Sequence, residues 1–343
     1  MKKILFAIAA IAALSACSKS EVEYEAAGEI TFTPVAKNIT KAMMDNGETF
    51  NTNEQFNVWA FYNPTVQANN NINAWVAEYV ANSENGAKVY IDDKPFAYDG
   101  TYQLWAGVTP YFWPKVGTLA FAGYYPSSAP AAYTLSDEAN EMTFTDVENS
   151  WVSDAETNIE DLMYFNLTKC YNGNNVTAVF KHALAWLTIN LSTTKATLDA
   201  GATITVSSVK FTEVMPQGDA VVANQAPIEW TPEGDADEVE VVASTVTLGT
   251  TAQMQKQPLL IPQTMDGELH VTYTITSTDN SSFTETKVIT LNEMLYDGDK
   301  ELSSWEASKH YVYNIVISTN EILIDASVVN WEDNKVEIPV EVK

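Results

Sequence analysis

Apolar and polar residues alternate along most of this chain, which is the pattern of β-strands that bury one face. Four runs show it most clearly and place the following residues on one side of a strand: Phe56, Val58, Ala60 and Tyr62; Leu119, Phe121 and Gly123; Leu187, Ile189 and Leu191; and Leu269, Val271, Tyr273 and Ile275. Turn-forming pairs such as Asp99-Gly100 and Asp266-Gly267 separate the runs. Many short strands at regular turn spacing predict an all-β protein of sandwich domains.

Two departures from this alternation carry further predictions. Within residues 204–211 the apolar positions shift from Ile204 and Val206 to Val209 and Phe211, which predicts a β-bulge at the intervening serines, Ser207 and Ser208. Helical periodicity is confined to two short segments, residues 73–82 and 291–304. We therefore expect short helices there and strands elsewhere.

The N-terminus has the layout of a secretory signal. Lys2 and Lys3 precede an apolar run over residues 4–14, and small residues and a cysteine follow. The run is shorter than the roughly 20 residues that a membrane span needs. Leu14-Ser15-Ala16-Cys17 resembles the lipobox of bacterial lipoproteins, which implies removal of residues 1–16, multiple acylation of Cys17 and a polar tether over residues 17–28. The alternative is an ordinary signal peptide with a chance cysteine.

Length and charge restrict the organisation and the partners of the chain. A chain of 343 residues exceeds one usual core, and the polar segment 169–175 predicts a boundary between domains at 29–174 and 175–343. With 18 basic and 45 acidic side chains the net charge is −27, and loss of Lys2 and Lys3 leaves 16 against 45, or −29. This charge excludes nucleic acid as an expected partner. Cys170 is the only other cysteine, so an acylated Cys17 leaves no intrachain disulfide.

Catalytic and metal-binding patterns are missing from the sequence. The three histidines, His182, His270 and His310, have no second ligand at metal spacing, so a structural role is favoured for each. The sequence has no nucleophile elbow, phosphate loop or nucleotide fingerprint, which predicts a protein that is not an enzyme, has no catalytic residues and needs no cofactor or metal. Acidic residues 233–240 and 297–299 are interpreted as solvated loops in preference to weak calcium sites.

One aromatic cluster leaves two interpretations open. It consists of Tyr102, Trp105, Tyr111, Phe112 and Trp113. Core packing is favoured because aromatic rings supply much of the buried area of a sandwich, and a sugar-stacking platform is the alternative.

Four segments together resemble the fimbrillin family, the type V pilins. They are Ile39-Thr40-Lys41-Ala42 with Phe50 and residues 56–61; Tyr111-Phe112-Trp113-Pro114 with residues 119–126; residues 180–185 with Asn190-Leu191; and residues 311–315 with Trp331. The resemblance implies two tandem β-sandwich domains of transthyretin-like fold, export as a lipoprotein, trimming in the loop after the first strand and polymerisation by strand exchange. The family motif usually carries arginine where Lys41 stands, and this chain contains no arginine.

The resemblance implies a structural and adhesive subunit of surface fimbriae on the outer membrane. Its partners would be other pilin subunits and a host or bacterial surface glycan or protein. A glycan-binding lipoprotein that assists nutrient uptake is the alternative function.

Three parts of the chain carry the expected assembly sites. Residues 29–35 form the first strand, and residues 37–53 form an exposed loop in which cleavage between Lys41 and Ala42 is expected. In residues 335–343 the aliphatic Val336, Ile338, Val340 and Val342 alternate with polar residues and Pro339. This segment is expected to be a donor strand for a neighbouring subunit, and an ordinary edge strand is the alternative.

Overall fold

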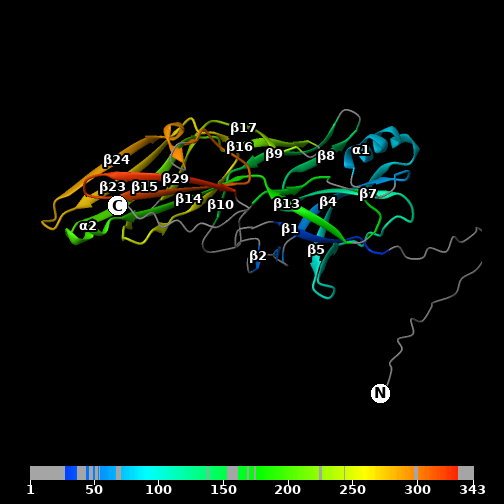
Figure 1. Ribbon diagram of the computed structural model, residues 1–343, viewed down its shortest axis with the longest axis horizontal. Coiled ribbons are helices and arrows are strands. Elements are labelled where there is room, and N and C mark those ends of the chain that lie inside the picture. The colour runs from blue at the N-terminus through cyan, green and yellow to red at the C-terminus, as the bar shows by residue number, and fades with distance from the viewer. Residues whose placement is uncertain are drawn as a thin grey trace, which may run out of the picture.

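The computed structural model is an all-β protein, as the alternation predicted (Figure 1). It describes residues 28–36, 44–45, 49–50, 53, 55–66, 71–136, 139–152, 161–167, 170–173, 175–223, 226–242, 244–296 and 300–330. The helices in this part are α1 (Ile72–Ala81), α2 (Lys195–Asp199) and the 3-10 turns η1 (Ser83–Asn85) and η2 (Leu291–Glu293). None of the described helices is long and apolar enough to cross a membrane.

The first sheet, called sheet I, closes on itself. Its strands run in the order β11 (Met163–Phe165), β13 (Val176–His182), β1 (Thr31–Ala36), β6 (Leu104–Gly107), β5 (Lys88–Asp99), β4 (Gln55–Asn63), β7 (Thr118–Tyr125) and β12 (Cys170–Tyr171). Because β11 also pairs with β7, the strands from β11 to β7 form a ring. Its interior is an aromatic core that includes Phe32, Phe56, Phe96, Phe121 and Phe180.

A second sheet covers one outer side of this ring. Sheet II has the order β17 (Glu229–Glu233), β16 (Gln217–Ala223), β9 (Asn140–Glu148) and β8 (Ala131–Leu135). Its Met142 and Phe144 share one core with Trp59 of β4 and Tyr124 of β7. Helix α1 joins that core through Trp75, whose indole N–H donates to Thr118 Oγ1 at 2.8 Å.

Sheets III and IV face each other in a second sandwich at the opposite end of the molecule (Figure 1). Sheet III contains β10 (Ser150–Val152), β21 (Gln257–Leu260), β14 (Ala185–Thr193), β28 (Lys309–Ile317), β29 (Ile322–Asn330), β25 (Leu295–Tyr296) and β26 (Lys300–Glu301), with β20 (Gln253–Met254) beside β14. Sheet IV contains β18 (Asp237–Val242), β15 (Thr203–Val214), β23 (Glu268–Thr276) and β24 (Ser282–Thr290), with β19 (Val246–Thr247) beside β15. Two short pairs are also found among the described residues: β2 (Met44–Asp45) with β3 (Thr49–Phe50), and β22 (Gln263–Thr264) with β27 (Ser304–Trp305).

Most of the predicted elements are present. Strands β14 and β23 bury alternate residues, and the register of β15 against β23 shifts between Val206 and Ser208, which confirms the bulge. Helix α1 confirms the segment predicted at 73–82. Strands β4 and β7 differ from the prediction because they are buried almost throughout on both faces, with the ring interior on one side and sheet II on the other.

The helix predicted over residues 291–304 is wrong. Among its described residues, 291–296 and 300–304, only Leu291–Glu293 form a 3-10 turn, and the rest include the short strands β25 and β26 and the first residue of β27. The apolar residues Met294, Leu302 and Trp305 reach the second core from this extended chain. Helix α2 was not predicted, and its first turn is capped by Thr194, whose Oγ1 accepts from Thr197 N–H at 3.2 Å.

Strand pairing crosses the boundary predicted between residues 174 and 175. Strand β13 follows the boundary but lies in sheet I beside β1. Strands β16 and β17 also follow it and belong to sheet II with β8 and β9. The division into domains at 29–174 and 175–343 stays a prediction, and the two halves share sheets.

Candidate assembly site

Strand β1 lies in the interior of sheet I, with a partner strand on each side. It pairs in parallel with β13 over five residue pairs, from Phe32 opposite Val176 to Ala36 opposite Phe180. On its other side it pairs antiparallel with β6 through Thr31 opposite Ala106 and Phe32 opposite Trp105. Loss of β1 would therefore leave two facing strands without their partner.

The side chains of β1 point alternately into the core and towards solvent. Ile30, just before the strand, and Phe32 are fully buried, whereas Thr33 is exposed. The Phe32 ring meets Phe96, Phe121 and Phe56 edge to face, with centroid distances of 4.9, 5.3 and 5.8 Å. Such contacts add to the free energy of burial, so Phe32 is the main apolar anchor of β1.

Fewer main-chain bonds hold β1 than its length would allow. Pro34 lies opposite Ala178 in the ladder and has no N–H to donate. Just before the strand, the Ile30 N–H donates to the Tyr111 carbonyl at 2.7 Å and the Trp113 N–H donates to the Gly28 carbonyl at 3.0 Å. A side-chain bond also joins Asn175 Nδ2 to Thr33 Oγ1.

A polar network holds the opposite part of the ring. The Tyr124 hydroxyl donates to Asp93 Oδ1 at 2.8 Å, and Asn57 Nδ2 lies 2.8 Å from the same oxygen and 2.9 Å from the hydroxyl. Burial, followed by the bond to Asp93, raises the pKa of Tyr124 well above its usual value. Tyr124 therefore stays a neutral donor at any physiological pH.

The site residues predicted from the sequence lie outside the described residues. These are the lipidation site Cys17, the cleavage site Lys41 and Ala42, and the donor-strand residues Val336, Ile338, Val340 and Val342. Of the segment predicted to be an exposed loop at 37–53, the described part includes the β2–β3 pair. The first strand predicted at 29–35 is present as β1, and its interior position was not predicted.

Each histidine has a protein partner, in agreement with the structural role expected for it. His182 Nδ1 lies 2.8 Å from Asp161 Oδ2, and both residues are buried. His310 Nε2 lies 2.8 Å from Thr188 Oγ1, and its ring stacks on Trp186 at a centroid distance of 3.6 Å. His270 Nε2 lies 2.8 Å from Glu268 Oε2.

Strand register brings together three carboxylates that are scattered in the sequence. Oxygens of Asp146, Asp219 and Glu233 lie within 4.8 Å of one another on neighbouring strands of sheet II. The Asp146 N–H donates to Asp219 Oδ1 at 2.9 Å. Oxygen ligands of this kind suit a cation such as calcium, but Asp146 and Glu233 are exposed, and exposed acidic groups are also common without one. Only Glu233 belongs to an acidic stretch singled out from the sequence.

The aromatic cluster divides between the core and the surface. Trp105 and Trp113 lie in the core of sheet I, and Tyr111 packs against it. Tyr102 and Phe112 are exposed, at 72% and 49% of their surface. The members that could stack on a sugar are therefore fewer than the sequence alone indicated.

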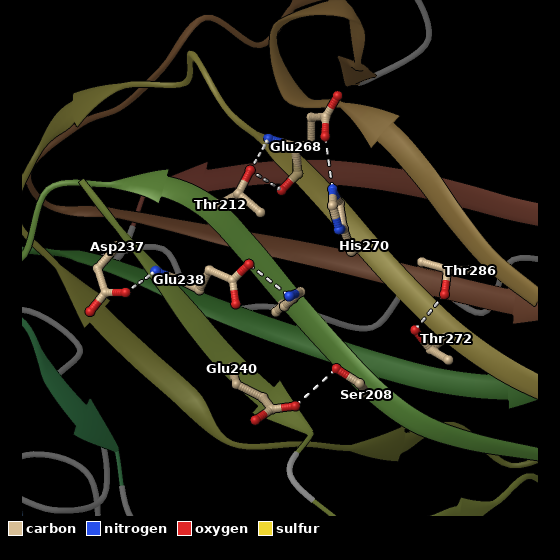
Figure 2. Close-up of polar contacts among 10 residues, drawn as sticks. Ser208, Thr212, Asp237, Glu238, Glu240, Glu268, His270, Thr272 and Thr286 are labelled. Carbon is tan, nitrogen blue, oxygen red and sulfur yellow. Dashed lines mark hydrogen bonds and ion pairs between the residues drawn. The ribbon is translucent and has the colours of Figure 1, made fainter.

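The outer face of sheet IV is polar, and its side chains bond to one another (Figure 2). Ser208 donates to Glu240 at 2.9 Å, Lys210 Nζ lies 2.7 Å from Glu238, and the hydroxyls of Thr272 and Thr286 are 2.9 Å apart. Strands with alternating apolar and polar residues bury one face of a sheet and leave the other polar and solvated, as sheet IV does.

Comparison with known proteins points to one family. Residues 40–331 match the fimbrillin-like family, and residues 1–18 match the lipid attachment site of prokaryotic membrane lipoproteins. No curated protein sequence matches the chain.

Solved structures that are similar to this chain come from Bacteroides and Porphyromonas species. A putative cell adhesion protein from Bacteroides uniformis shares 16% identity over 89% of this chain and 98% of its own, with a TM-score of 0.50. A fimbrial protein from Bacteroides vulgatus also shares 16% identity, over 89% and 100% of the two chains, with a TM-score of 0.49. The tip fimbrial protein Mfa3 from Porphyromonas gingivalis, truncated at its C-terminus, shares 9% over 88% and 99%, with a TM-score of 0.43. At 16% identity, the similarity to the Bacteroides uniformis protein supports the fold of this chain and nothing about its function.

Proposed function

Because this chain belongs to the fimbrillin-like family and carries a lipoprotein attachment site, we propose that it is a structural and adhesive subunit of surface fimbriae. In this proposal Cys17 is acylated and holds the precursor at the outer membrane, and the chain has no catalytic role. Residues 29–174 and 175–343 would be its two transthyretin-like domains, with β13 and β16 of the second range pairing with strands of the first. The partners would be other pilin subunits and a surface glycan or protein to which the fimbria adheres.

The observation that carries the proposal is the interior position of β1. A subunit that loses β1 would expose the edges of β13 and β6 and the aromatic rings that surround Phe32. An exposed apolar sheet with free edges binds an extended strand from another chain. Such a subunit would be ready for donor-strand exchange.

The C-terminal segment has the composition of the donor. Val336, Ile338, Val340 and Val342 alternate with charged residues and Pro339, as Ile30 and Phe32 alternate with Thr31 and Thr33. Each aliphatic side chain that becomes buried contributes roughly 1.5–3 kcal/mol, which in sum is enough to hold neighbouring subunits together. A register slip of one residue would put Glu337 and Glu341 in the apolar position, so the register would be unique.

Cleavage between Lys41 and Ala42 would release β1. The described part of β1 ends at Ala36, and β2 begins at Met44, so the proposed cut lies between these two strands. After cleavage β1 would be held by noncovalent contacts alone, and Pro34 removes one potential main-chain bond from them. A lysine-directed protease would be needed, because the chain contains no arginine.

The alternative function, a glycan-binding lipoprotein that assists nutrient uptake, has less support. Trp105 and Trp113, the largest rings of the aromatic cluster, are buried in the core of sheet I. Rings in a core are not available to stack on a sugar.

Deletion of residues 335–343 and the double substitution Ile338→Asp/Val340→Asp test the proposal. We expect both variants to give folded, exported monomers and no filaments by electron microscopy. The matched control, Glu337→Gln/Glu341→Gln on the polar side of the segment, should assemble normally. Filaments of ordinary length from the deletion variant would show that the donor lies elsewhere, and filament subunits that begin at Cys17 would exclude cleavage at Lys41.

A further inference from the structure

The outer face of sheet IV carries three consecutive rows of hydroxyl side chains. Strand register aligns Thr203 with Thr276 and Ser282, then Thr247 with Thr205, Thr274 and Thr284, then Ser208 with Thr272 and Thr286. These ten residues, called the hydroxyl face, are exposed or half-buried, whereas alternate residues of β15 and β23 such as Val206 and Val271 form the core. The three rows contain no charged side chain.

Charged residues begin directly beside the hydroxyl face. The next row contains Lys210 and His270, and Glu238 and Glu240 of β18 lie close to it (Figure 2). At the β18 border of the face Glu240 Oε1 accepts from Ser208 at 2.9 Å, so the neutral part of the hydroxyl face is the two rows that contain Thr276 and Thr274. This neutral area lies on a chain whose formal net charge is −27.

The hydroxyls on this face bond to each other across strands. Thr272 and Thr286 are 2.9 Å apart, and Thr274 and Thr284 are 2.8 Å apart. Each pair keeps donor and acceptor capacity because one hydroxyl can donate once and accept twice. The bonds within each pair lower the number of water contacts that must be given up when the face is covered.

We infer that the hydroxyl face is a lateral contact between copies of this chain, through which neighbouring fimbriae associate side by side. Hydroxyls are donors and acceptors at once, so a surface made of them is complementary to an identical surface, which a charged surface is not. Repulsion between two strongly acidic copies is weakest where both present a neutral area. A second copy is therefore the partner that fits this face.

The size of the face indicates a weak contact that is repeated. At a strand spacing of about 4.8 Å and a row spacing of about 7 Å, its ten residues cover about 300 Å² per copy. This is well below the roughly 800 Å² per partner of a stable interface. Single subunits would stay apart, while filaments that present many copies would associate through the sum of the contacts. In this respect the inference rests on the proposed function.

The test introduces like charges at the centre of the face. Thr274→Glu/Thr284→Glu should leave filament formation unchanged and lower the fraction of filaments found in bundles, seen by electron microscopy and by low-speed sedimentation. Each contact should weaken about fivefold or more from charge repulsion. The control Thr134→Glu/Thr231→Glu, at exposed strand positions of sheet II, should bundle as the wild type does. If the double variant does not fold, Thr284→Glu alone on the exposed strand β24 serves the same purpose.

A second measurement separates this inference from the proposed function. If the wild-type chain forms no filaments, the proposed function fails. Static light scattering of the unassembled protein still tests whether two copies attract each other through the hydroxyl face. At a salt concentration of roughly 0.3 M, where long-range repulsion is screened, the second virial coefficient should be lower for the wild type than for Thr274→Glu/Thr284→Glu. Equal bundling and equal virial coefficients in variant and wild type would overturn the inference.

Discussion

Replacement of Phe32 by alanine should destabilise the unassembled protein strongly and the assembled filament hardly at all. Phe32 is fully buried and meets three phenylalanine rings at centroid distances of 4.9 to 5.8 Å. Burial of a phenylalanine contributes about 1.5–3 kcal/mol, and the cavity left by its removal adds to this loss. Because β13 and β6 flank β1, the site cannot collapse easily, and we expect a loss of about 4 kcal/mol, within the usual range for Phe→Ala.

Urea unfolding of the unassembled chain, followed by tryptophan fluorescence, measures the first part of this prediction. The midpoint should fall with little change in slope. Phe144→Ala is the matched control, because Phe144 is also fully buried but lies in β9 of sheet II. Both variants should lose similar stability as monomers.

The stability of assembled filaments in urea should distinguish Phe32→Ala from Phe144→Ala. If β1 leaves the subunit during assembly, filaments assembled from Phe32→Ala should resist urea as wild-type filaments do, whereas Phe144→Ala filaments should be weakened. Equal weakening of both would mean that β1 remains in the assembled subunit. That result would refute strand replacement at this position.

Three further predictions concern other parts of the molecule. Cys17→Ala should move the protein out of the detergent phase or leave it unprocessed, and unchanged partitioning would exclude lipidation at this residue. Gly123→Ala should destabilise the fold by about 1–3 kcal/mol or more, because a Cβ there would lie 2.4 Å from the Asn57 carbonyl oxygen and from a Phe165 ring carbon. Thermal unfolding measures this loss, and a gain in stability would contradict the close packing at Gly123. Burial raises the pKa of Tyr164 from 10.0 to about 12, so its contribution to stability should be intact below pH 10 and lost as the pH rises from 10 through 12. Tyrosinate absorbance and melting temperature measured together over this range test it, and complete ionisation near pH 10 in the folded protein would contradict it.

Local signals in the sequence were sufficient for several elements. The alternation in β14 and β23, the bulge near Ser208 and the helix α1 each depend on residues a few positions apart. The segment at 291–304 shows the limit of such signals, because the spacing of its apolar residues resembles a helix. Contacts of Met294, Leu302 and Trp305 with the second core hold it as short strands instead.

Burial on two faces also depended on distant parts of the chain. Alternation predicted one buried side for β4 and β7, and sheet II covers the other side with residues such as Met142 and Phe144. The residues of β4 alone do not predict that sheet II, which comes later in the chain, packs on its second face.

Local patterns in the sequence were enough to predict a lipoprotein-type signal, a protein made of strands and a strand near residue 30. Only the tertiary structure placed β1 between β13 and β6 and surrounded Phe32 with phenylalanine rings. Alternation likewise predicts which residues of a strand face outward, but the rows of the hydroxyl face exist only because of the register between β15, β23 and β24. The physical reason is the same in both cases. A strand's period is set by its own backbone geometry, whereas its partner and its register are set by the free energy of contacts with residues far along the chain.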